Sequence, residues 1–261
     1  MPYLHLRQVC LVAPALEPVV SDIAAIMGLE ICYRDPHVGK DGLENALLPV
    51  GPILLEVVAP KREGTAAGRF LDKTGGRGGY MAIFACDDPD GRAAVANAMG
   101  VRTANIINHP PYHGVQLHPR DCRAAFIELN HTTGSDDVLG PYPPAGPDWT
   151  RAIRRDVTTA LTEVVLESPE PASLAAHWGR ILDHAPTQCA EGCQKGAEEC
   201  AQELVLPNAR IRVERGEREL MSGLTFRVAD AARVIGAARA RGHAVANDVF
   251  TVGGVAFQLM M

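Results

Sequence analysis

The sequence lacks the features that would direct a chain to a membrane or to nucleic acid. No apolar segment approaches the roughly 20 residues that a membrane-spanning helix needs. The N-terminal stretch MPYLHLRQVC has neither the basic region nor the long apolar run of a secretory signal peptide. The 25 Lys and Arg residues are outnumbered by 31 Asp and Glu residues and form no basic run that would follow a phosphate backbone. We therefore expect a cytoplasmic protein that binds neither membranes nor nucleic acid.

A disulfide framework is also not favoured. The chain has 7 cysteines, an odd number, and most of them lie in separate apolar segments, as small buried residues do in a reducing compartment. Cys189, Cys193 and Cys200 differ because they share one polar stretch, CAEGCQKGAEEC. Their spacing matches no zinc pattern, and no histidine follows at ligand spacing. We interpret the stretch as an insertion with incidental thiols, and a metal site is the alternative.

A unit of one strand, one helix and further short strands recurs along the 261 residues. In the first copy, the apolar periodicity predicts a strand, a helix and three strands at 4–12, 16–27, 30–33, 45–50 and 53–58. A helix at 66–73 follows. In the second copy, the same elements are expected at 80–86, 89–99, 101–107, 114–117 and 124–130.

The second half of the chain repeats this pattern after the stretch TTGSDDVLGPYPPAGPDW, whose Gly, Pro and Asp content is typical of a linker. The third copy is expected at 161–167, 171–182, 203–206 and 210–214, and the fourth at 223–228, 230–241, 243–245, 248–252 and 254–260. The sequence therefore predicts two domains, at 1–133 and 156–261, joined by a linker at 134–155.

One strand of the first copy, in PILLEVVAP, carries a charged residue in an apolar setting. A buried carboxylate such as Glu56 is costly unless it is hydrogen-bonded, protonated or bound to a cation. Aligning LLPVGPILLE with LVLPNARIRVE places Glu214 where Glu56 stands. Aligning AAFIELN with VAFQLMM places Gln258 where Glu128 stands. The repeats thus mark a small set of polar positions on their last strands.

The four tandem units, with the phrases GLENALLPVGPILLEVVAP, GGYMAIFACDD and GVQLHPRDCRAAFIEL, resemble the vicinal oxygen chelate superfamily. This superfamily includes glyoxalase I, methylmalonyl-CoA epimerase, bleomycin-resistance proteins and extradiol dioxygenases. The phrases are most similar to uncharacterised glyoxalase-like members, over nearly the whole chain outside the linker. The resemblance implies an α+β fold in which four tandem βαβββ units form two cup-shaped domains with mixed sheets.

The resemblance also implies a divalent metal site in the N-terminal cup. The matching positions are Gln8, Glu56 and Glu128, whose oxygen donors suit Mg, Mn or Ca, with Ni, Zn and Fe as further candidates. The remaining position is Met81, where a glyoxalase or epimerase would supply histidine. Methionine sulfur is a poor ligand for these ions, so this departure counts against a metal.

The chemistry that this pattern supports is proton transfer. An ion chelated by two vicinal oxygens of a substrate stabilises an enolate, while a carboxylate at its edge moves the proton. Glu56 or Glu128 would be that base. The ordinary alternative is that each glutamate faces solvent or bonds to a turn, as strand glutamates often do.

Three histidines lie near the expected edges of the cup. His113 and His118 occupy the hairpin before the Glu128 strand, and His37 lies in the loop after the second strand. One of them could supply the missing ligand or act as an acid or base near neutral pH. We treat His118 as a candidate catalytic residue and His37, Met81 and His113 as candidate substrate contacts. A surface or capping role is the alternative for each histidine.

The C-terminal domain is expected to be degenerate. Its corresponding positions are Glu163, Glu214, Gly223 and Gln258. This set cannot form the facial triad of two histidines and one carboxylate that binds non-haem iron, which disfavours an extradiol dioxygenase. Arg210 and Arg212 alternate with Glu214 along one strand, and we interpret them as a solvated face with ion pairs.

The sequence therefore predicts a glyoxalase-like or epimerase-like lyase or isomerase that acts on a small oxygenated metabolite, with a divalent metal as a candidate cofactor. The alternative is a metal-free protein that sequesters a small molecule, as bleomycin-resistance proteins do, and Met81 favours it. In both cases the partner is a small molecule. The pairing of units can be satisfied within one chain or in a homodimer, and the sequence leaves both open.

Overall fold

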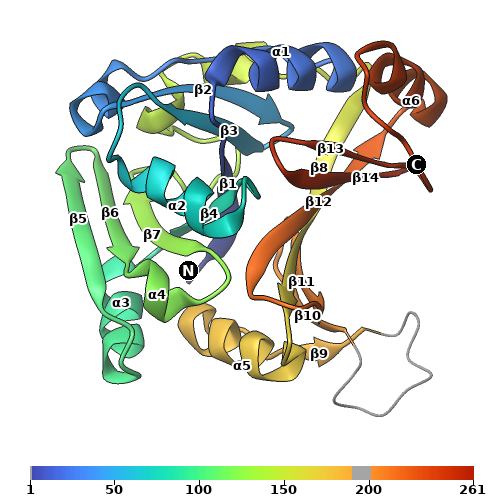
Figure 1. Ribbon diagram of the computed structural model, residues 1–261. Helices are drawn as coiled ribbons and strands as arrows, with labels where there is room; N and C mark the ends of the chain where they lie inside the picture. The colour runs from blue at the N-terminus through green and yellow to red at the C-terminus, as the bar shows by residue number, and fades with distance from the viewer. Residues whose placement is uncertain (1, 190–200) are drawn as a thin grey trace. The chain divides into compact units, whose positions relative to one another are not determined.

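The computed structural model describes residues 2–189 and 201–261 and shows four consecutive repeats of strand, helix and strands (Figure 1). Of the three clustered cysteines, Cys193 and Cys200 lie outside the described residues, so the interpretation of that stretch stays a prediction. Within the described residues, no helix is long and apolar enough to cross a membrane.

The first repeat follows the predicted order closely. Its elements are β1 (Leu4–Val12), α1 (Leu16–Met27), η1 (Pro36–Asp41), β2 (Leu43–Val50) and β3 (Ile53–Pro60), followed by α2 (Ala66–Thr74). The second repeat contains β4 (Gly79–Cys86), α3 (Pro89–Ala98), β5 (Thr103–His109), β6 (Tyr112–Leu117), α4 (Pro119–Cys122) and β7 (Phe126–Thr132).

Two short 3-10 helices, η2 (Pro143–Ala145) and η3 (Trp149–Ala152), lie in the predicted linker. The third repeat contains β8 (Thr158–Ser168), α5 (Pro171–Leu182), β9 (Thr187–Gln188), β10 (Gln202–Val205) and β11 (Arg210–Arg215). The fourth contains β12 (Leu220–Val228), α6 (Ala231–Ala240), β13 (Val249–Val252) and β14 (Val255–Met260).

Two predicted short strands are wrong. The segment 30–33 forms a single bridge, between Tyr33 and Leu47, because Pro36 follows closely and begins a 3-10 helix instead of extending the ladder. The segment 243–245 forms no strand. The bridge nearest to it pairs Ala246 with Val249 around two left-handed residues, Asn247 and Asp248, and so tight a turn leaves no length for a ladder.

The chain divides into two compact units, and each unit takes two repeats. We call Gln8–Tyr80, Tyr142–Thr162 and Gly223–Met261 the Glu56 unit, and Met1–Arg7, Met81–Pro141 and Glu163–Ser222 the Glu128 unit. The Glu56 unit thus contains most of the first and fourth repeats, and the Glu128 unit most of the second and third. The predicted domains 1–133 and 156–261 group the repeats differently, and that grouping stays a prediction.

In the Glu56 unit, parallel and antiparallel strand pairs alternate. β3 pairs in parallel with β1 and antiparallel with β2, and β14 pairs in parallel with β12 and antiparallel with β13. Helix α1 places apolar residues such as Val20, Ile23 and Ile26 at helical spacing and packs them on β2 and β3 (Figure 1). Because almost every residue of β1 and β3 is buried, a polar side chain on these strands is withdrawn from water.

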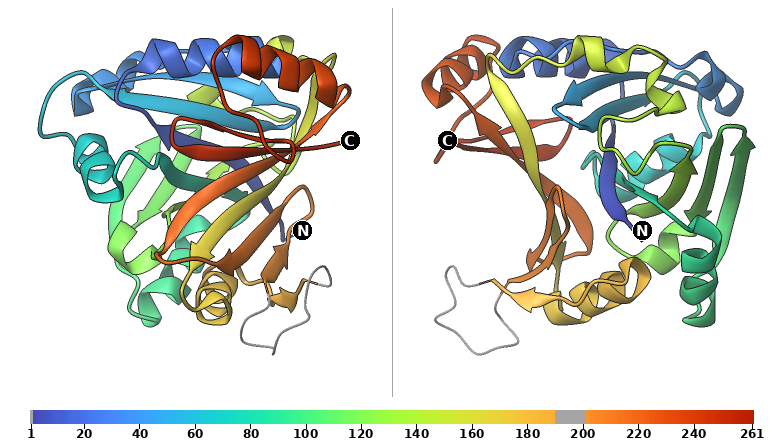
Figure 2. Two further views of the ribbon diagram at one scale, coloured as in Figure 1. Left: turned by 45° about the vertical axis from the view of Figure 1, so that its right-hand side comes forward. Right: turned by 180° about the vertical axis from the view of Figure 1, so that it is seen from behind.

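The Glu128 unit repeats this arrangement. β7 pairs in parallel with β4 and antiparallel with β6, whose other neighbour is β5, the outer strand visible in Figure 2. β11 pairs in parallel with β8 and antiparallel with β10. Helix α3 covers β6 and β7, and α5 covers β10 and β11. The indole Nε1 of Trp178 donates to the Cys122 carbonyl at 2.9 Å and ties α5 to the end of α4.

Candidate functional site

The register of the strands brings three polar side chains of the Glu56 unit onto one face. Glu56 on β3 stands opposite Cys10 of β1 and opposite Leu47 of β2. Since side chains alternate along a strand, Gln8 and Asn45, each two residues from those partners, share the face of Glu56. The predicted proximity of Gln8 and Glu56 is thus present within this unit.

Glu56 is buried, and both of its carboxylate oxygens accept hydrogen bonds from amides. Gln8 Nε2 donates to Oε2 at 2.7 Å, and Asn45 Nδ2 donates to Oε1 at 2.6 Å. The residue is 8% exposed. The Asn45 amide is itself held, because its Oδ1 accepts from the backbone N–H of Asp35 at 2.8 Å. These hydrogen bonds from neutral donors offset part of the cost of burying the carboxylate.

Burial raises the pKa of Glu56 above its ordinary value of 4.5. Removal from water is the largest cause, because it disfavours the charged carboxylate, and the negative charge of Asp35 adds to it. The hydrogen bonds from Asn45, Cys10 and Gln8 oppose the shift. The environment therefore makes Glu56 a stronger proton acceptor than an exposed glutamate.

Glu128 in the other unit has a comparable set of partners. On β7 it stands opposite Gln116 of β6, and Tyr112 and Gly114 share that face of β6. The Tyr112 hydroxyl donates to Oε1, and Gln116 Nε2 donates to Oε2 at 2.8 Å. Glu128 is 3% exposed. Two neutral donors therefore hold this second buried carboxylate as well.

Gly114 makes the contact between Tyr112 and Glu128 possible. A Cβ atom at this position would lie 3.1 Å from Glu128 Oε1 and 3.1 Å from Tyr112 Cε1. The tyrosine ring thus crosses the space that a side chain would fill. The amide of Gln116 is satisfied on its other side, because its Oε1 accepts from Asn105 Nδ2 at 3.2 Å.

Solved structures that resemble the chain over its whole length identify the fold. A manganese-bound glyoxalase from Novosphingobium aromaticivorans matches 99% of this chain and 82% of its own, with a TM-score of 0.68 and 14% identity. A hypothetical protein from Staphylococcus aureus matches 98% of both chains, with a TM-score of 0.66 and 10% identity. The chain has the vicinal oxygen chelate fold.

The fold prediction from the sequence is confirmed in its α+β class and its mixed sheets. Methylmalonyl-CoA epimerase from Streptomyces coelicolor also resembles part of the chain, at 24% identity over 49% of this chain and 96% of its own, with a TM-score of 0.43. No family model matches the sequence. No curated protein matches it either.

The side chains described here do not fit a divalent ion in the way that this fold suggests. Gln8 and Glu56 lie in one unit and Glu128 in the other, so the three-ligand set stays a prediction. Around Glu56 the possible ligand atoms are those of one carboxylate and Gln8 Oε1, and both amides turn N–H groups towards the carboxylate. Such groups repel a cation. Within the described residues, no group of three His, Cys, Asp or Glu side chains could hold a metal ion.

Met81 occupies the position where histidine was expected. It lies on β4, where the neighbouring Ile83 stands opposite Glu128, so Met81 and Glu128 share one face of the sheet in the Glu128 unit. It is buried, with 9% of its surface exposed. A thioether offers that face an apolar surface and a weak acceptor.

The three candidate histidines bond to nearby acidic or backbone groups. His37 is 82% exposed, and its Nδ1 lies 2.8 Å from Asp35 Oδ1. His113 Nε2 lies 3.1 Å from Asp90 Oδ1. His118 caps α4, with its Nδ1 accepting from the Arg120 N–H at 3.3 Å. Each has the partners of a surface or capping residue, and their predicted roles at a site stay predictions.

The third repeat carries an ion pair where the first carries the buried Glu56, and the fourth carries Gln258 where the second carries Glu128. Arg212 lies 3.0 Å from Glu214 and 4.0 Å from Glu163 on the predicted ion-paired face. Partial burial raises the pKa of Glu214, and Arg212 opposes the rise. Gln258 Nε2 donates to the Leu259 carbonyl at 3.1 Å. Gly223 pairs with Ala256 within the β12–β14 ladder.

Sequence reasoning missed the partners of the two carboxylates: Asn45, Tyr112 and Gln116. Each is a polar residue at a strand position whose side chain faces inward. The alternation of side chains along a strand could have identified these positions from the sequence. Asn130 and Thr132 follow Glu128 on the same face of β7. Within residues 2–189 and 201–261, the Asn130 amide and the Thr132 hydroxyl have no hydrogen-bond partner.

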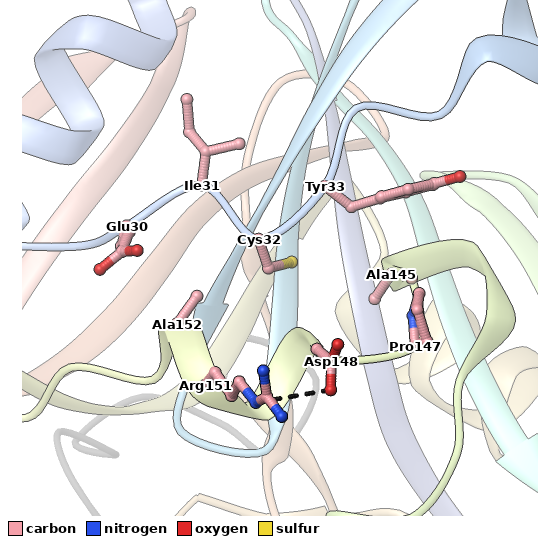
Figure 3. A pocket seen from close by; sticks show the side chains of 10 residues that line it. Glu30, Ile31, Cys32, Tyr33, Ala145, Pro147, Asp148, Arg151 and Ala152 are labelled. Carbon is pink, nitrogen blue, oxygen red and sulfur yellow. Dashed lines mark ion pairs between the residues drawn. The ribbon is translucent and has the colours of Figure 1, made fainter.

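A cavity of about 340 Å³ lies beside β2 in the Glu56 unit (Figure 3). The segment from Glu30 to Tyr33 forms one side and the segment from Ala145 to Ala152 the other, as Figure 3 shows. Its charged residues are engaged in ion pairs, Asp148 with Arg151 at 3.5 Å and Glu30 with Arg154. None of the predicted site residues lines it, so we do not place the chemistry there.

Proposed function

We propose that the protein is a lyase or isomerase that moves a proton on a small oxygenated metabolite, with Glu56 as the base. The observation that supports this best is the buried carboxylate itself. It is held by Gln8 and Asn45 at 2.7 and 2.6 Å, and its pKa is raised by burial. A base of raised pKa, oriented by hydrogen bonds, is suited to proton abstraction near neutral pH.

In this proposal Glu56 removes a proton from a carbon next to a carbonyl group, and the electron pair of that C–H bond moves into an enolate. Glu56 is then the acid that returns the proton to the same carbon, on the face it left or, if the planar enolate turns over within the site, on the opposite face, which inverts that carbon. If a leaving group stands beside the enolate carbon, its departure gives a lyase instead. The N–H groups of Gln8 and Asn45 keep the carboxylate in place throughout.

No step of this proposal passes through a metal ion. A resident ion in this fold would polarise the carbonyl as a Lewis acid. The amide N–H groups that face Glu56 do not suit such an ion. Metal binding at Glu56 can be measured directly, because a metal that binds there would raise the thermal stability of the wild type and not that of Glu56→Gln.

Deuterium exchange tests the proposal. We expect the purified protein to catalyse incorporation of solvent deuterium at the C–H groups of hydroxyacetone, dihydroxyacetone or pyruvate, measured by proton NMR. Glu56→Gln is expected to abolish it. Glu214→Gln, at the matching position of the third repeat, is the control and is expected to keep it. Exchange at the uncatalysed rate in the wild type, or unchanged exchange in Glu56→Gln, would contradict the proposal.

A second candidate is a metal-free protein that binds a small molecule without converting it. Met81, buried on the face that it shares with Glu128, favours this function because it replaces a ligand with an apolar surface. Binding of a small carbonyl compound without any deuterium exchange would support this second function over the first.

A further inference from the structure

Glu56 belongs to a row of three buried side chains that crosses β3, β1 and β4 within the Glu56 unit. Cys10 of β1 stands opposite Glu56. β1 and β4 are neighbours in the sheet, and the Val12 N–H donates to the Gly78 carbonyl at 2.7 Å where β1 ends and β4 begins. Two residues further into each of these antiparallel strands, Tyr80 stands opposite Cys10. Glu56, Cys10 and Tyr80 therefore share one face of the sheet, and all three are buried.

Helix α2 covers this row. Its Phe70 ring packs edge to face against the Tyr80 ring, with the ring centroids 4.9 Å apart, and the helix also contacts β3. Figure 1 and Figure 2 both show α1 and α2 on opposite sides of β2 and β3. Burial raises the pKa of Tyr80, the nearby Cys10 and Glu56 add to the rise, and Arg69 of α2 opposes it. The helix thus stands between the row and the solvent.

The attachment of α2 to the sheet is slight. Within the helix, the buried residues are Ala67 and Leu71. The hydrogen bonds that cap it join residues of the same segment, because the Gly68 N–H donates to Thr65 Oγ1 at 3.0 Å and the Gly75 N–H donates to the Leu71 carbonyl. The helix can therefore leave the sheet with its caps intact, and such a local opening costs less than global unfolding.

Glycines in the left-handed conformation lie at both ends of α2. Gly64 precedes the helix with φ of 72°, and Gly75 and Gly76 follow it with φ of 67° and 82°. A Cβ atom at any of the three would meet nothing within 4 Å, so glycine serves there for its backbone freedom and not for close packing. Gly78 is different, because a Cβ atom there would lie 2.3 Å from the Gly253 carbonyl oxygen. The segment thus has a free hinge at each end and an anchored position beyond the second.

We propose that α2 is a lid that swings about Gly64 and about Gly75 and Gly76, and that it controls the access of small molecules to Glu56. The structure shows the closed state, in which Glu56 is 8% exposed. This inference rests on the proposed function and extends it, because a buried base meets a ligand only when the lid opens. Closure then excludes water from the base while the proton is transferred.

Alkylation of Cys10 tests the lid in the wild type and without a ligand. N-ethylmaleimide is the probe, and peptide mass spectrometry follows its attachment to Cys10 with time. Lid opening exposes few residues, so we expect the rate at Cys10 to rise less than about twofold between 0 and 1 M urea. Exposure by global unfolding would raise it about fivefold or more. The steeper rise, or no reaction at Cys10, would overturn the assignment.

Two variants assign the opening to α2. Phe70→Ala removes the ring that rests on Tyr80, and we expect it to raise the alkylation rate of Cys10 about tenfold. The control is Val234→Ala, at a buried position of α6, which packs on α1. It should lower stability in urea unfolding but leave the rate at Cys10 within about twofold. An unchanged rate in Phe70→Ala, or a rate that follows the lost stability in Val234→Ala, would overturn the assignment.

Deuterium exchange in the same samples separates the two proposals. Alkylation of Cys10 that meets these expectations, without deuterium exchange, would mean that the lid stands while the proton-transfer function fails. Exchange that depends on Glu56, with Cys10 accessible only through unfolding, would mean that the function stands and the lid fails.

Discussion

Glu56 and Glu128 are the same kind of residue on matching strands, but their surroundings differ in one respect. Each carboxylate is buried and accepts from a glutamine and from at least one further neutral side chain. Around Glu128 the glutamine is satisfied at both ends. Around Glu56 it leaves an acceptor open. A glutamine that is hydrogen-bonded at both ends indicates that the carboxylate beside it is structural. A glutamine with one unpartnered end indicates that the carboxylate beside it binds a ligand.

The largest difference between the two carboxylates is expected in activity. Glu56→Gln should lower the rate of deuterium exchange by at least about 10²-fold, because a positioned base contributes on that scale. Glu128→Gln, measured in the same NMR assay, should stay within about threefold of the wild type. Equal losses in both variants would remove the distinction between a structural and a functional carboxylate.

The free energy of unfolding should depend more on the partners of Glu128 than on those of Glu56. Tyr112→Phe leaves Glu128 without one of its donors and is expected to cost about 2 kcal/mol in the free energy of unfolding. Gln8→Met also removes a donor from Glu56, but it eliminates the open acceptor, so the cost should stay below about 1 kcal/mol. Urea unfolding followed by circular dichroism measures both. A larger cost for Gln8→Met would contradict the comparison.

The close approach of Tyr112 to Glu128 also predicts a loss of stability when Gly114 is replaced, and this loss should be no larger than that of Tyr112→Phe. Gly114→Ala places a Cβ atom 3.1 Å from two neighbouring atoms and should destabilise the protein by about 1–2 kcal/mol. The control is Gly236→Ala in α6, where a Cβ atom would meet nothing within 4 Å. This control should be stabilising by up to about 1 kcal/mol, since alanine favours the helix. Thermal unfolding of both variants measures the contrast.

The raised pKa of Glu56 predicts a pH dependence of stability. In the unfolded chain the group titrates near its ordinary value of 4.5, and in the folded protein it titrates higher. The folded state therefore holds the proton more tightly, and stability declines as pH rises from about 4.5 through the folded pKa. Within that window the loss reaches at most about 1.4 kcal/mol per pH unit.

Glu56→Gln cannot titrate and serves as the reference for this effect. The free energy of unfolding of the wild type, minus that of the variant, should fall between pH 4.5 and neutrality when both are unfolded in urea. A difference that rises with pH over this range would mean that the folded protein stabilises the charged form of Glu56.

Much of the fold could be predicted from local patterns. The bounds of β1, α1 and α5 coincide with the predicted ones, because apolar periodicity and turn residues mark them. The strand expected at 30–33 failed because so short a segment does not reveal whether a partner strand is in reach. The division into compact units depends on packing between repeats, which periodicity does not encode.

The site could be predicted only in outline. The repeat alignment identified Glu56 and Glu128 as special, and Gln8 indeed contacts Glu56. It could not identify Asn45, because the role of that amide depends on a backbone N–H of Asp35, fixed by the 3-10 helix that follows. Nor could it show that the Gln8 amide turns its N–H towards the carboxylate, which is the fact that argues against a cation.

The titration of Glu56 tests the central claim most directly. Carbon-13 NMR of glutamate side-chain carboxyl groups, with Glu56→Gln to assign the signal, gives the pKa with and without Zn²⁺ or Mg²⁺. A carboxylate held by neutral amides in a buried setting should titrate above 4.5, and neither ion should shift it. Titration below 4.5, or a shift on adding either ion that disappears in Glu56→Gln, would contradict the account.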